Sequence, residues 1–240
     1  MSWIEFWNGK TTIYANDRHR RAHYQLIAYD IIAHLPRHGA RVLDYGCGEA
    51  LHADAVAGCC EHLYLCDAAE TVRAALQERF GGYGALSVLA PGDIATIPDG
   101  SLDLVVANSV VQYMTADQFG QALALWRAKL APGGRLLLGD IIPPHIGPLT
   151  DALALLRFAR SNRFLAAAGA SLVRTFFSDY RRTRSRLGLL RFDEPAILAR
   201  LAAAGFAGRR HDANVGHNPA RLTIIAEPVR TIARADQHAA

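Results

Sequence analysis

The chain has 240 residues, of which 51% are hydrophobic, and a formal net charge of +4 at pH 7. That length suits one large domain, or one domain with a sizeable insertion, and the apolar content is enough to bury a substantial core. The sequence has no low-complexity tract and no internal repeat, which argues against a repeat protein.

The first residues, MSWIEFWNGK, contain no basic stretch followed by an apolar run, so we expect no signal peptide. The longest apolar run, Leu165 to Val173, is far shorter than the roughly 20 residues that a membrane-spanning helix needs. We therefore expect a cytoplasmic protein without a transmembrane segment. The four cysteines form no CxxC pair, so buried thiols are a better interpretation than a zinc site.

In the first half of the chain, strands and helices are expected to alternate. Apolar residues recur at helical spacing from Asp17 to Leu35, with Asp17 as a candidate cap and Pro36 as the stop. Strands are then expected at 41–45, 62–67, 86–90, 102–108 and 135–141, and helices at 51–56, 69–80 and 116–130. The alternation favours an α/β protein with a parallel sheet covered on both faces.

After the fifth strand the alternation breaks. Residues 143–192 contain no strand but two helical stretches, and a further helix follows at 193–204 with Asp193 as a candidate cap. The strands expected at 208–213 and 222–226 are joined by the short segment NVGHNPAR, so they should form an antiparallel hairpin. Residues 230–240 are interpreted as a flexible tail.

The segment VLDYGCGEA, at residues 42–50, places a Gly-x-Gly turn between the first strand and a helix. Such a turn brings the backbone close to a ligand in two enzyme classes, the dinucleotide-dependent dehydrogenases and the methyltransferases that use S-adenosylmethionine. Asp44 would suit a cationic amino group or water but not a pyrophosphate. Leu51 occupies the position of the third glycine in the dinucleotide fingerprint.

Polar residues also end or follow the next three strands. Asp67 ends the second strand, about 20 residues past the glycines, where a carboxylate can accept hydrogen bonds from both ribose hydroxyls in either class. The segment GDI at 92–94 follows the third strand, where an acid can reach an adenine amino group. The segment NSVVQYM ends the fourth strand and should face the same crevice.

Together LDYGCG, LCD, GDI, NSVVQYM and LAPGGRLLL, within about 41–141, resemble the class I S-adenosylmethionine-dependent methyltransferases. The resemblance implies a Rossmann-like sheet of seven mostly parallel strands with the last antiparallel, helices on both faces and a helical lid inserted after strand five. It implies S-adenosylmethionine as cofactor and S-adenosylhomocysteine as product. It divides the chain into a helical arm over the cofactor (1–36), a methyltransferase domain (37–229) with its cap insertion at 143–192, and the tail (230–240).

The resemblance also implies a set of cofactor-binding residues. Those near the methionine part would be Asp44, Gly46, Cys47 through its backbone, and Gly48; those near the ribose and adenine would be Asp67, Ala68, Asp93 and Ile94; Asn108, Ser109 and Tyr14 would complete the set. Each has a plainer interpretation: the glycines as turn residues, Asp67 as a helix cap, Asp93 as an ordinary turn acid and Tyr14 as a core or surface aromatic.

Methyl transfer from a sulfonium is an in-line displacement in which the protein aligns the nucleophile, excludes water and sometimes removes a proton. Candidate catalytic residues are His217, which lies in the hairpin loop, His145 after two prolines, and Tyr113. A structural role is the alternative for each. His23 is a further candidate proton acceptor, and its spacing from His19 suits a metal, but no carboxylate pattern accompanies the pair, so no metal site is expected.

The predicted lid is rich in arginine. Arg157, Arg160 and Arg163 form a stripe on one helix, and Arg174, Arg181, Arg182, Arg184 and Arg186 follow. A solvated basic face is the plain interpretation. The alternatives are binding of an anionic substrate, peripheral contact with a membrane surface, and contact with RNA, although no RNA-binding module accompanies these residues.

The predicted function is S-adenosylmethionine-dependent methyl transfer to a small apolar or amphiphilic molecule, at an oxygen, nitrogen or carbon. RNA or protein methylation is an alternative, but residues 108–111 lack the Pro-Pro-aromatic pattern of many nucleic-acid amino methyltransferases. The sequence is also compatible with a non-catalytic cofactor-binding partner subunit and, less well, with an NAD-linked dehydrogenase. We expect no nucleic-acid partner and no metal.

Overall fold

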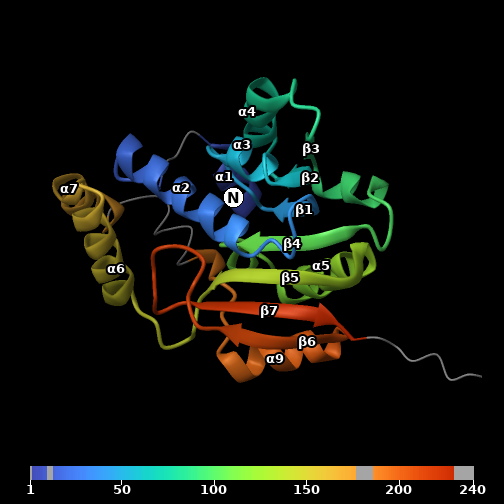
Figure 1. Cartoon of the computed structure of the whole chain (residues 1–240). Coiled ribbons are helices and arrows are strands. Elements are labelled where there is room, and N and C mark those ends of the chain that lie inside the picture. The colour runs from blue at the N-terminus through green and yellow to red at the C-terminus, as the bar shows by residue number, and fades with distance from the viewer. Residues whose placement is uncertain (1, 10–12, 177–185, 230–240) are drawn as a thin grey trace, which may run out of the picture.

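The computed structural model describes residues 2–9, 13–176 and 186–229. Its centre is a seven-stranded sheet in the order β3-β2-β1-β4-β5-β7-β6 (Figure 1). The strands are β1 (Ala40–Tyr45), β2 (Cys60–Cys66), β3 (Leu86–Leu89), β4 (Leu102–Asn108), β5 (Leu130–Ile141), β6 (Phe206–His211) and β7 (Leu222–Pro228). The first five are parallel to one another, and β7 runs antiparallel to both β5 and β6, which confirms the predicted fold class.

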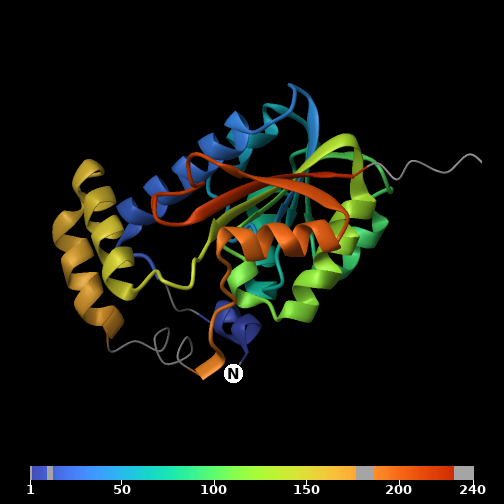
Figure 2. The same ribbon diagram turned by 90° about the horizontal axis from the view of Figure 1, so that it is seen from below.

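Helices pack on both faces of the sheet, as Figure 2 shows from below. One face carries α2 (Asp17–Ala33), α3 (Ala53–Ala57) and α4 (Glu70–Phe80), and the other carries α5 (Ala116–Lys129) and α9 (Glu194–Ala203). The strands are buried on both sides because neighbouring residues face opposite layers: Val42 packs with the first set of helices and Leu43 with the second. This burial explains why the strands appear in the sequence as continuous apolar runs.

Two helix N-cap residues, Asp17 and Asp193, are predicted from the sequence, and the structure confirms one of them. Asp193 caps α9 as expected, because its carboxylate accepts a hydrogen bond from the Ala196 N–H at 2.9 Å. The cap expected at Asp17 is wrong: Asn16 caps α2 by accepting from the His19 N–H at 2.9 Å. Asp17 is the first helical residue, where its carboxylate instead pairs with the arginines one turn later.

The fifth strand begins earlier than expected. A strand is expected at 135–141, but β5 starts at Leu130 directly after α5. Leu102 of β4 pairs with Leu130, whereas Leu104 pairs with Arg135, so the intervening residues form a bulge. Gly133, with a φ of +83°, supplies the left-handed conformation that this bulge requires.

The insertion after β5 contains α6 (Pro148–Ser161) and α7 (Leu165–Phe176), a helical hairpin near the start of α2 (Figures 1 and 2). The Phe164 ring, between these two helices, stacks on the His19 ring of α2 with centroids 4.8 Å apart. Arg181, Arg182, Arg184 and the predicted tail lie outside the described residues, as does the side chain of Arg174. Within the described part of the chain, none of the helices is both long and apolar enough to cross a membrane.

Candidate active site

A cavity of about 950 Å³ opens where the parallel strands end. Residues from the ends of β1, β2, β4 and β5 line it, together with residues from α2 and the β6–β7 loop. The lining includes these predicted site residues: Tyr14, Asp44, Gly46, Cys47, Gly48, Asp67, Ala68, Asn108, Ser109, Tyr113 and His217. Parallel α/β sheets bind ligands at this edge, so the position agrees with the topology.

The turn after β1 requires both of its glycines. Gly46 and Gly48 have φ angles of +74° and +57°, which side chains rarely adopt. A Cβ atom on Gly46 would lie 2.5 Å from Cγ2 of Val110, and one on Gly48 would lie 2.6 Å from the Tyr24 hydroxyl. The turn is therefore packed between α2 and the residues that follow β4. Because Gly46 and Gly48 have no side chains, their backbone atoms line the cavity directly.

Asp67 links the end of β2 to this turn. Its Oδ2 accepts a hydrogen bond from the Gly48 N–H at 3.0 Å, and its Oδ1 accepts one from the Ala69 N–H at 2.8 Å. Burial raises the pKa of Asp67, and these backbone hydrogen bonds oppose the rise. Each carboxylate oxygen has a second lone pair, so the group retains acceptor capacity for ligand hydroxyls.

Asp44 is a buried carboxyl on the cavity wall, with 8% of its surface exposed. Burial raises its pKa to about 7, and repulsion from the Asp67 carboxylate contributes. An ionised carboxylate in such a place is costly unless a positive charge lies beside it. The position therefore favours a cationic ligand group.

Asn108 and Ser109 follow from the end of β4. The buried Oδ1 of Asn108 has no hydrogen-bond partner among the described residues, which suggests that a ligand or water donates to it. Ser109 has a φ of +56°, and its hydroxyl donates to Oδ2 of Asp140 at 2.7 Å. Asp140, near the end of β5, has a φ of +59°, so strained backbone occurs at the ends of two adjacent strands, β4 and β5, beside the cavity.

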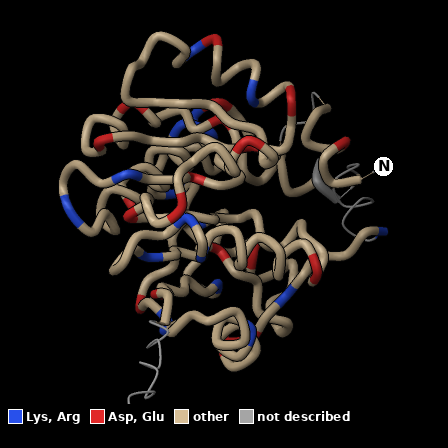
Figure 3. Tube along the Cα trace, turned by 90° about the vertical axis from the view of Figure 1, so that its right-hand side faces the viewer, with Lys and Arg blue, Asp and Glu red and all other residues tan. Residues whose placement is uncertain are grey.

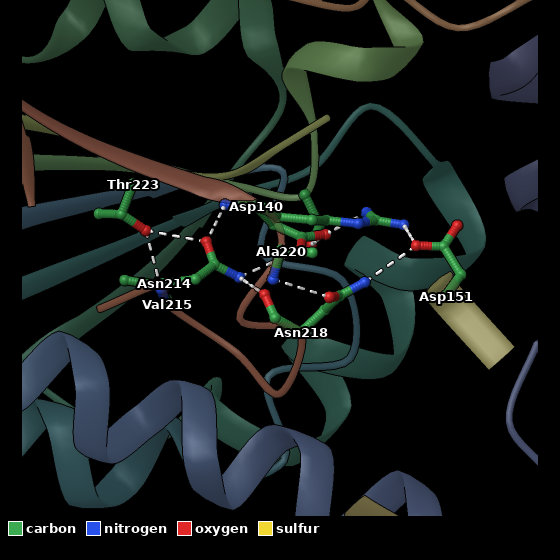
Figure 4. A network of polar contacts seen from close by, with 9 residues as sticks. Asp140, Asp151, Asn214, Val215, Asn218, Ala220 and Thr223 are labelled. Carbon is green, nitrogen blue, oxygen red and sulfur yellow. Dashed lines mark hydrogen bonds and ion pairs between the residues drawn. The ribbon is translucent and has the colours of Figure 1, made fainter. Parts of the chain in front are cut away.

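Asp140 belongs to a cluster that we call the polar wall, which consists of Asp140, Asp151 and Asn218, labelled in Figure 4, and Arg221. The Arg221 guanidinium donates to Asp140 at 2.8 Å and to Asp151 of α6 at 3.0 Å. Asn218 Nδ2 also donates to Asp151, at 2.9 Å. The wall thus joins β5, the α6 helix and the β6–β7 loop on one side of the cavity.

The sequence interpretation missed the polar wall. The one local signal was an acid at the end of the fifth strand, in RLLLGDI, which is a ligand-binding position in parallel sheets. Asp151 and Arg221 gave no such signal, because their partners lie about 70 residues or more away in the chain.

His217 lines the cavity next to the polar wall. Its ring stacks on the Phe158 ring, with centroids 4.8 Å apart and an interplanar angle of 24°. Burial lowers the pKa of His217, with Arg221 adding to the fall while Asp140 and Asp151 oppose it. The imidazole is therefore neutral at pH 7 and has one nitrogen able to accept a proton.

Two histidines of α2, His19 and His23, lie beside His217 of the β6–β7 loop. The His19 and His23 ring centroids are 6.3 and 6.2 Å from the His217 centroid. Burial, followed by repulsion from His217, lowers the pKa of His19 to about 4 and that of His23 to about 3. Across the described residues, the structure has no group of three or more His, Cys, Asp or Glu side chains that could hold a metal ion.

Three predicted site residues do not line the cavity. Asp93 lies in the first turn of a 3-10 helix, η1 (Pro91–Thr96), and its carboxylate accepts a hydrogen bond from the Ala90 N–H at 3.0 Å. The Ile94 side chain is fully buried in the core, and His145 is exposed. Pro91 is the residue of this segment that lines the cavity, so adenine binding by Asp93 and Ile94 stays a prediction.

Aromatic residues of the N-terminal arm close the other side of the cavity. In α1 (Trp3–Asn8), the Trp3 and Trp7 rings lie 4.7 and 5.5 Å from the Tyr113 ring, measured between centroids. Asn8 accepts a hydrogen bond from the Thr71 N–H at the start of α4, at 3.2 Å. The sequence interpretation placed an arm here but did not single out the two tryptophans.

Part of the chain is similar to known methyltransferases. Residues 43–138 match the family model of a methyltransferase domain. A probable nonribosomal peptide synthetase, CymA of Salinispora arenicola, is 32% identical over 150 residues, which are 60% of this chain. The chain spans only 2% of that relative's length.

Two solved structures share the fold. The 1,6-didemethyltoxoflavin-N1-methyltransferase of Burkholderia thailandensis, solved with 1,6-didemethyltoxoflavin and S-adenosylhomocysteine, has a TM-score of 0.55 and 19% identity, and the match covers 86% of this chain and 78% of that chain. The YcgJ protein of Bacillus subtilis has a TM-score of 0.55 and 16% identity, with 78% and 70% covered. At these identities, the likeness concerns the fold alone.

Proposed function

We propose that this class I S-adenosylmethionine-dependent methyltransferase transfers the methyl group to a small molecule by in-line displacement. The observation that carries the proposal is the cavity at the strand ends, which combines the glycine turn and Asp67 with a separate polar wall. A volume of about 950 Å³ is enough for the cofactor and a small acceptor together. A concave cavity of this size fits a small acceptor better than RNA or a folded protein.

The residues around the turn fit the cofactor. Asp67 would accept hydrogen bonds from the ribose hydroxyls, and the backbone of Gly46 to Gly48 would border the methionine part, where Asp44 can meet a positive charge. Asn108, which also lines the cavity, would contact the cofactor from the end of β4. The bound cofactor supplies an electrophilic methyl group on a sulfonium. The protein aligns the acceptor, excludes water and, through neutral His217, accepts a proton.

Ligand-dependent melting tests the cofactor assignment. We expect S-adenosylmethionine and S-adenosylhomocysteine each to raise the melting temperature, because a ligand that binds only the native state stabilises it. NADH should not. A shift with NADH alone, or no shift with either adenosyl compound, would refute the proposed function.

The affinity for S-adenosylmethionine should depend on pH through Asp44. Its folded pKa of about 7 exceeds the ordinary 3.8, so Asp44 is protonated at pH 6 and mostly ionised at pH 8. The ionised form attracts a cationic ligand, so affinity should rise about tenfold between these two values. Calorimetric titration of the wild type and Asp44→Asn at both values measures this, and the variant should lose the rise.

The raised pKa of Asp44 also predicts how the stability of the ligand-free protein changes with pH. Between about pH 4 and 7 the native state binds more protons at Asp44 than the unfolded chain does, so its contribution to stability falls as pH rises. A wild type and an Asp44→Asn variant with parallel pH profiles, in both melting and affinity, would show that the carboxyl plays no such role.

A further inference from the structure

The cavity is acidic although the chain as a whole has a net charge of +4. Basic and acidic positions are intermixed along the trace in Figure 3. Among the described residues, the charged side chains that line the cavity are different: they comprise five carboxylic acids, Asp44, Glu49, Asp67, Asp140 and Asp151, and two arginines, Arg20 and Arg221. When all are ionised, these side chains carry three more negative than positive charges, and the polar wall by itself carries one more negative than positive charge.

Both lining arginines are already shared between two carboxylates. Arg20 pairs with Asp17 and, at 2.9 Å, with Glu49. Arg221 pairs with Asp140 and Asp151 across the polar wall, where the three side chains are only 13%, 16% and 22% exposed. Arg157, Arg160 and Arg163 of the insertion do not line the cavity. An anionic substrate would therefore meet an excess of carboxylates among the described lining residues, which disfavours an anion-binding role for Arg157, Arg160 and Arg163.

The reaction itself moves a positive charge. When a neutral nitrogen attacks, its lone pair forms the C–N bond, the C–S bond breaks, and its electron pair stays on sulfur. The positive charge passes from sulfur to nitrogen. An acidic wall on the acceptor side is more favourable to that transition state than to the neutral acceptor in the ground state, which is the condition for catalysis. An oxyanion acceptor would lose binding energy at the same wall.

We propose that the methyl acceptor is a weakly basic amine nitrogen bearing a hydrogen, as in an aromatic amine, seated against the polar wall. This rests on the proposed function and specifies its substrate class. A strongly basic alkylamine fits less well, because an acidic site would hold it as an ammonium ion without a free lone pair.

The surrounding groups complete the step. After C–N bond formation, the N–H proton passes to the neutral His217 imidazole, which lines the cavity beside the wall. The nearby carboxylates of Asp140 and Asp151 favour the imidazolium that results. The carboxylates of the polar wall therefore stabilise two positive charges in turn, first the one that develops on the nitrogen and then the one on the His217 imidazolium.

The test compares probes of one shape and different charge. Protein loaded with S-adenosylhomocysteine is titrated with N-methylquinolinium, with methylnaphthalene, its neutral isostere, and with naphthoate. We expect the cation to bind about tenfold more tightly than the neutral isostere, and naphthoate to bind more weakly than both. Asp140→Asn and Asp151→Asn should each reduce the cation preference severalfold. Asn suits the left-handed backbone at position 140, so that variant should fold.

The matched control is Asp212→Asn, an exposed acid in the same β6–β7 connection that does not line the cavity. It should leave the preference unchanged. Equal binding of the cation and its isostere, no binding of the cation, a preference for naphthoate, or a preference untouched by the two wall variants would each overturn the proposal. Failure of S-adenosylhomocysteine itself to bind would instead refute the proposed function. A separate titration of the protein with S-adenosylhomocysteine alone therefore distinguishes that failure from failure of the substrate proposal.

Discussion

Asp67→Ala should reduce the affinity for S-adenosylmethionine at least about 100-fold, because hydrogen bonds to a charged acceptor contribute about 1.5–3 kcal/mol each and two ribose hydroxyls would lose theirs. The substitution also removes the acceptor of the Gly48 N–H, which holds the turn against β2. Calorimetric titration with S-adenosylmethionine and S-adenosylhomocysteine measures the loss.

A control separates this effect from general damage. Glu61→Ala removes an exposed acid at the opposite end of the same strand and should leave affinity unchanged. The ligand-free melting temperature of both variants shows whether they fold. If folded Asp67→Ala binds with wild-type affinity, the ribose lies elsewhere, and the assignment of this end of the cavity is wrong.

His217→Ala should lower kcat by about 100-fold, the lower range for removing a general base, while the affinity for the cofactor stays within about twofold. The wild-type rate should fall in acid, as the imidazole becomes protonated and cannot accept a proton. Because burial lowers the pKa of His217, this fall should lie below the ordinary value of 6.5. Turnover measured from pH 5 to pH 8 with an accepted nitrogen substrate tests both statements.

His211→Ala is the matched control for that experiment. His211 ends β6, just before the same loop, and does not line the cavity, so its removal should leave kcat and the pH profile unchanged. A merely structural role for His217 would lower the rate equally at all pH values. Wild-type turnover in His217→Ala would exclude it as the proton acceptor.

The candidate cofactor end of the cavity could be predicted from the sequence because its signals are local. Gly46 and Gly48 need a left-handed backbone and have no room for a Cβ atom, so the turn is encoded within a few residues. Asp67 follows a recognisable apolar strand, and parallel strands must all present their carboxyl ends at one edge. The short connection before β7 likewise predicted that this strand pairs antiparallel with β6, as the structure shows.

Other features depended on contacts that no local pattern predicts. Asn16 and not Asp17 caps α2, because Asn16 has an extended backbone whereas Asp17 is already helical. The start of β5 depends on a bulge imposed by pairing with β4. The neutrality of His217 follows from burial against Phe158 and the packing of α2, α6 and the hairpin loop around it.

The acidic side of the cavity belongs wholly to the tertiary structure. Asp140, Asp151 and Arg221 come from three segments, and each alone resembles an ordinary surface charge in the sequence. The sequence by itself determined the mostly parallel α/β sheet and its glycine turn, since short-range backbone geometry and strand burial leave periodic patterns in the sequence. Only folding decided which charges share the cavity, because electrostatic interactions depend on distance and burial rather than on order along the chain.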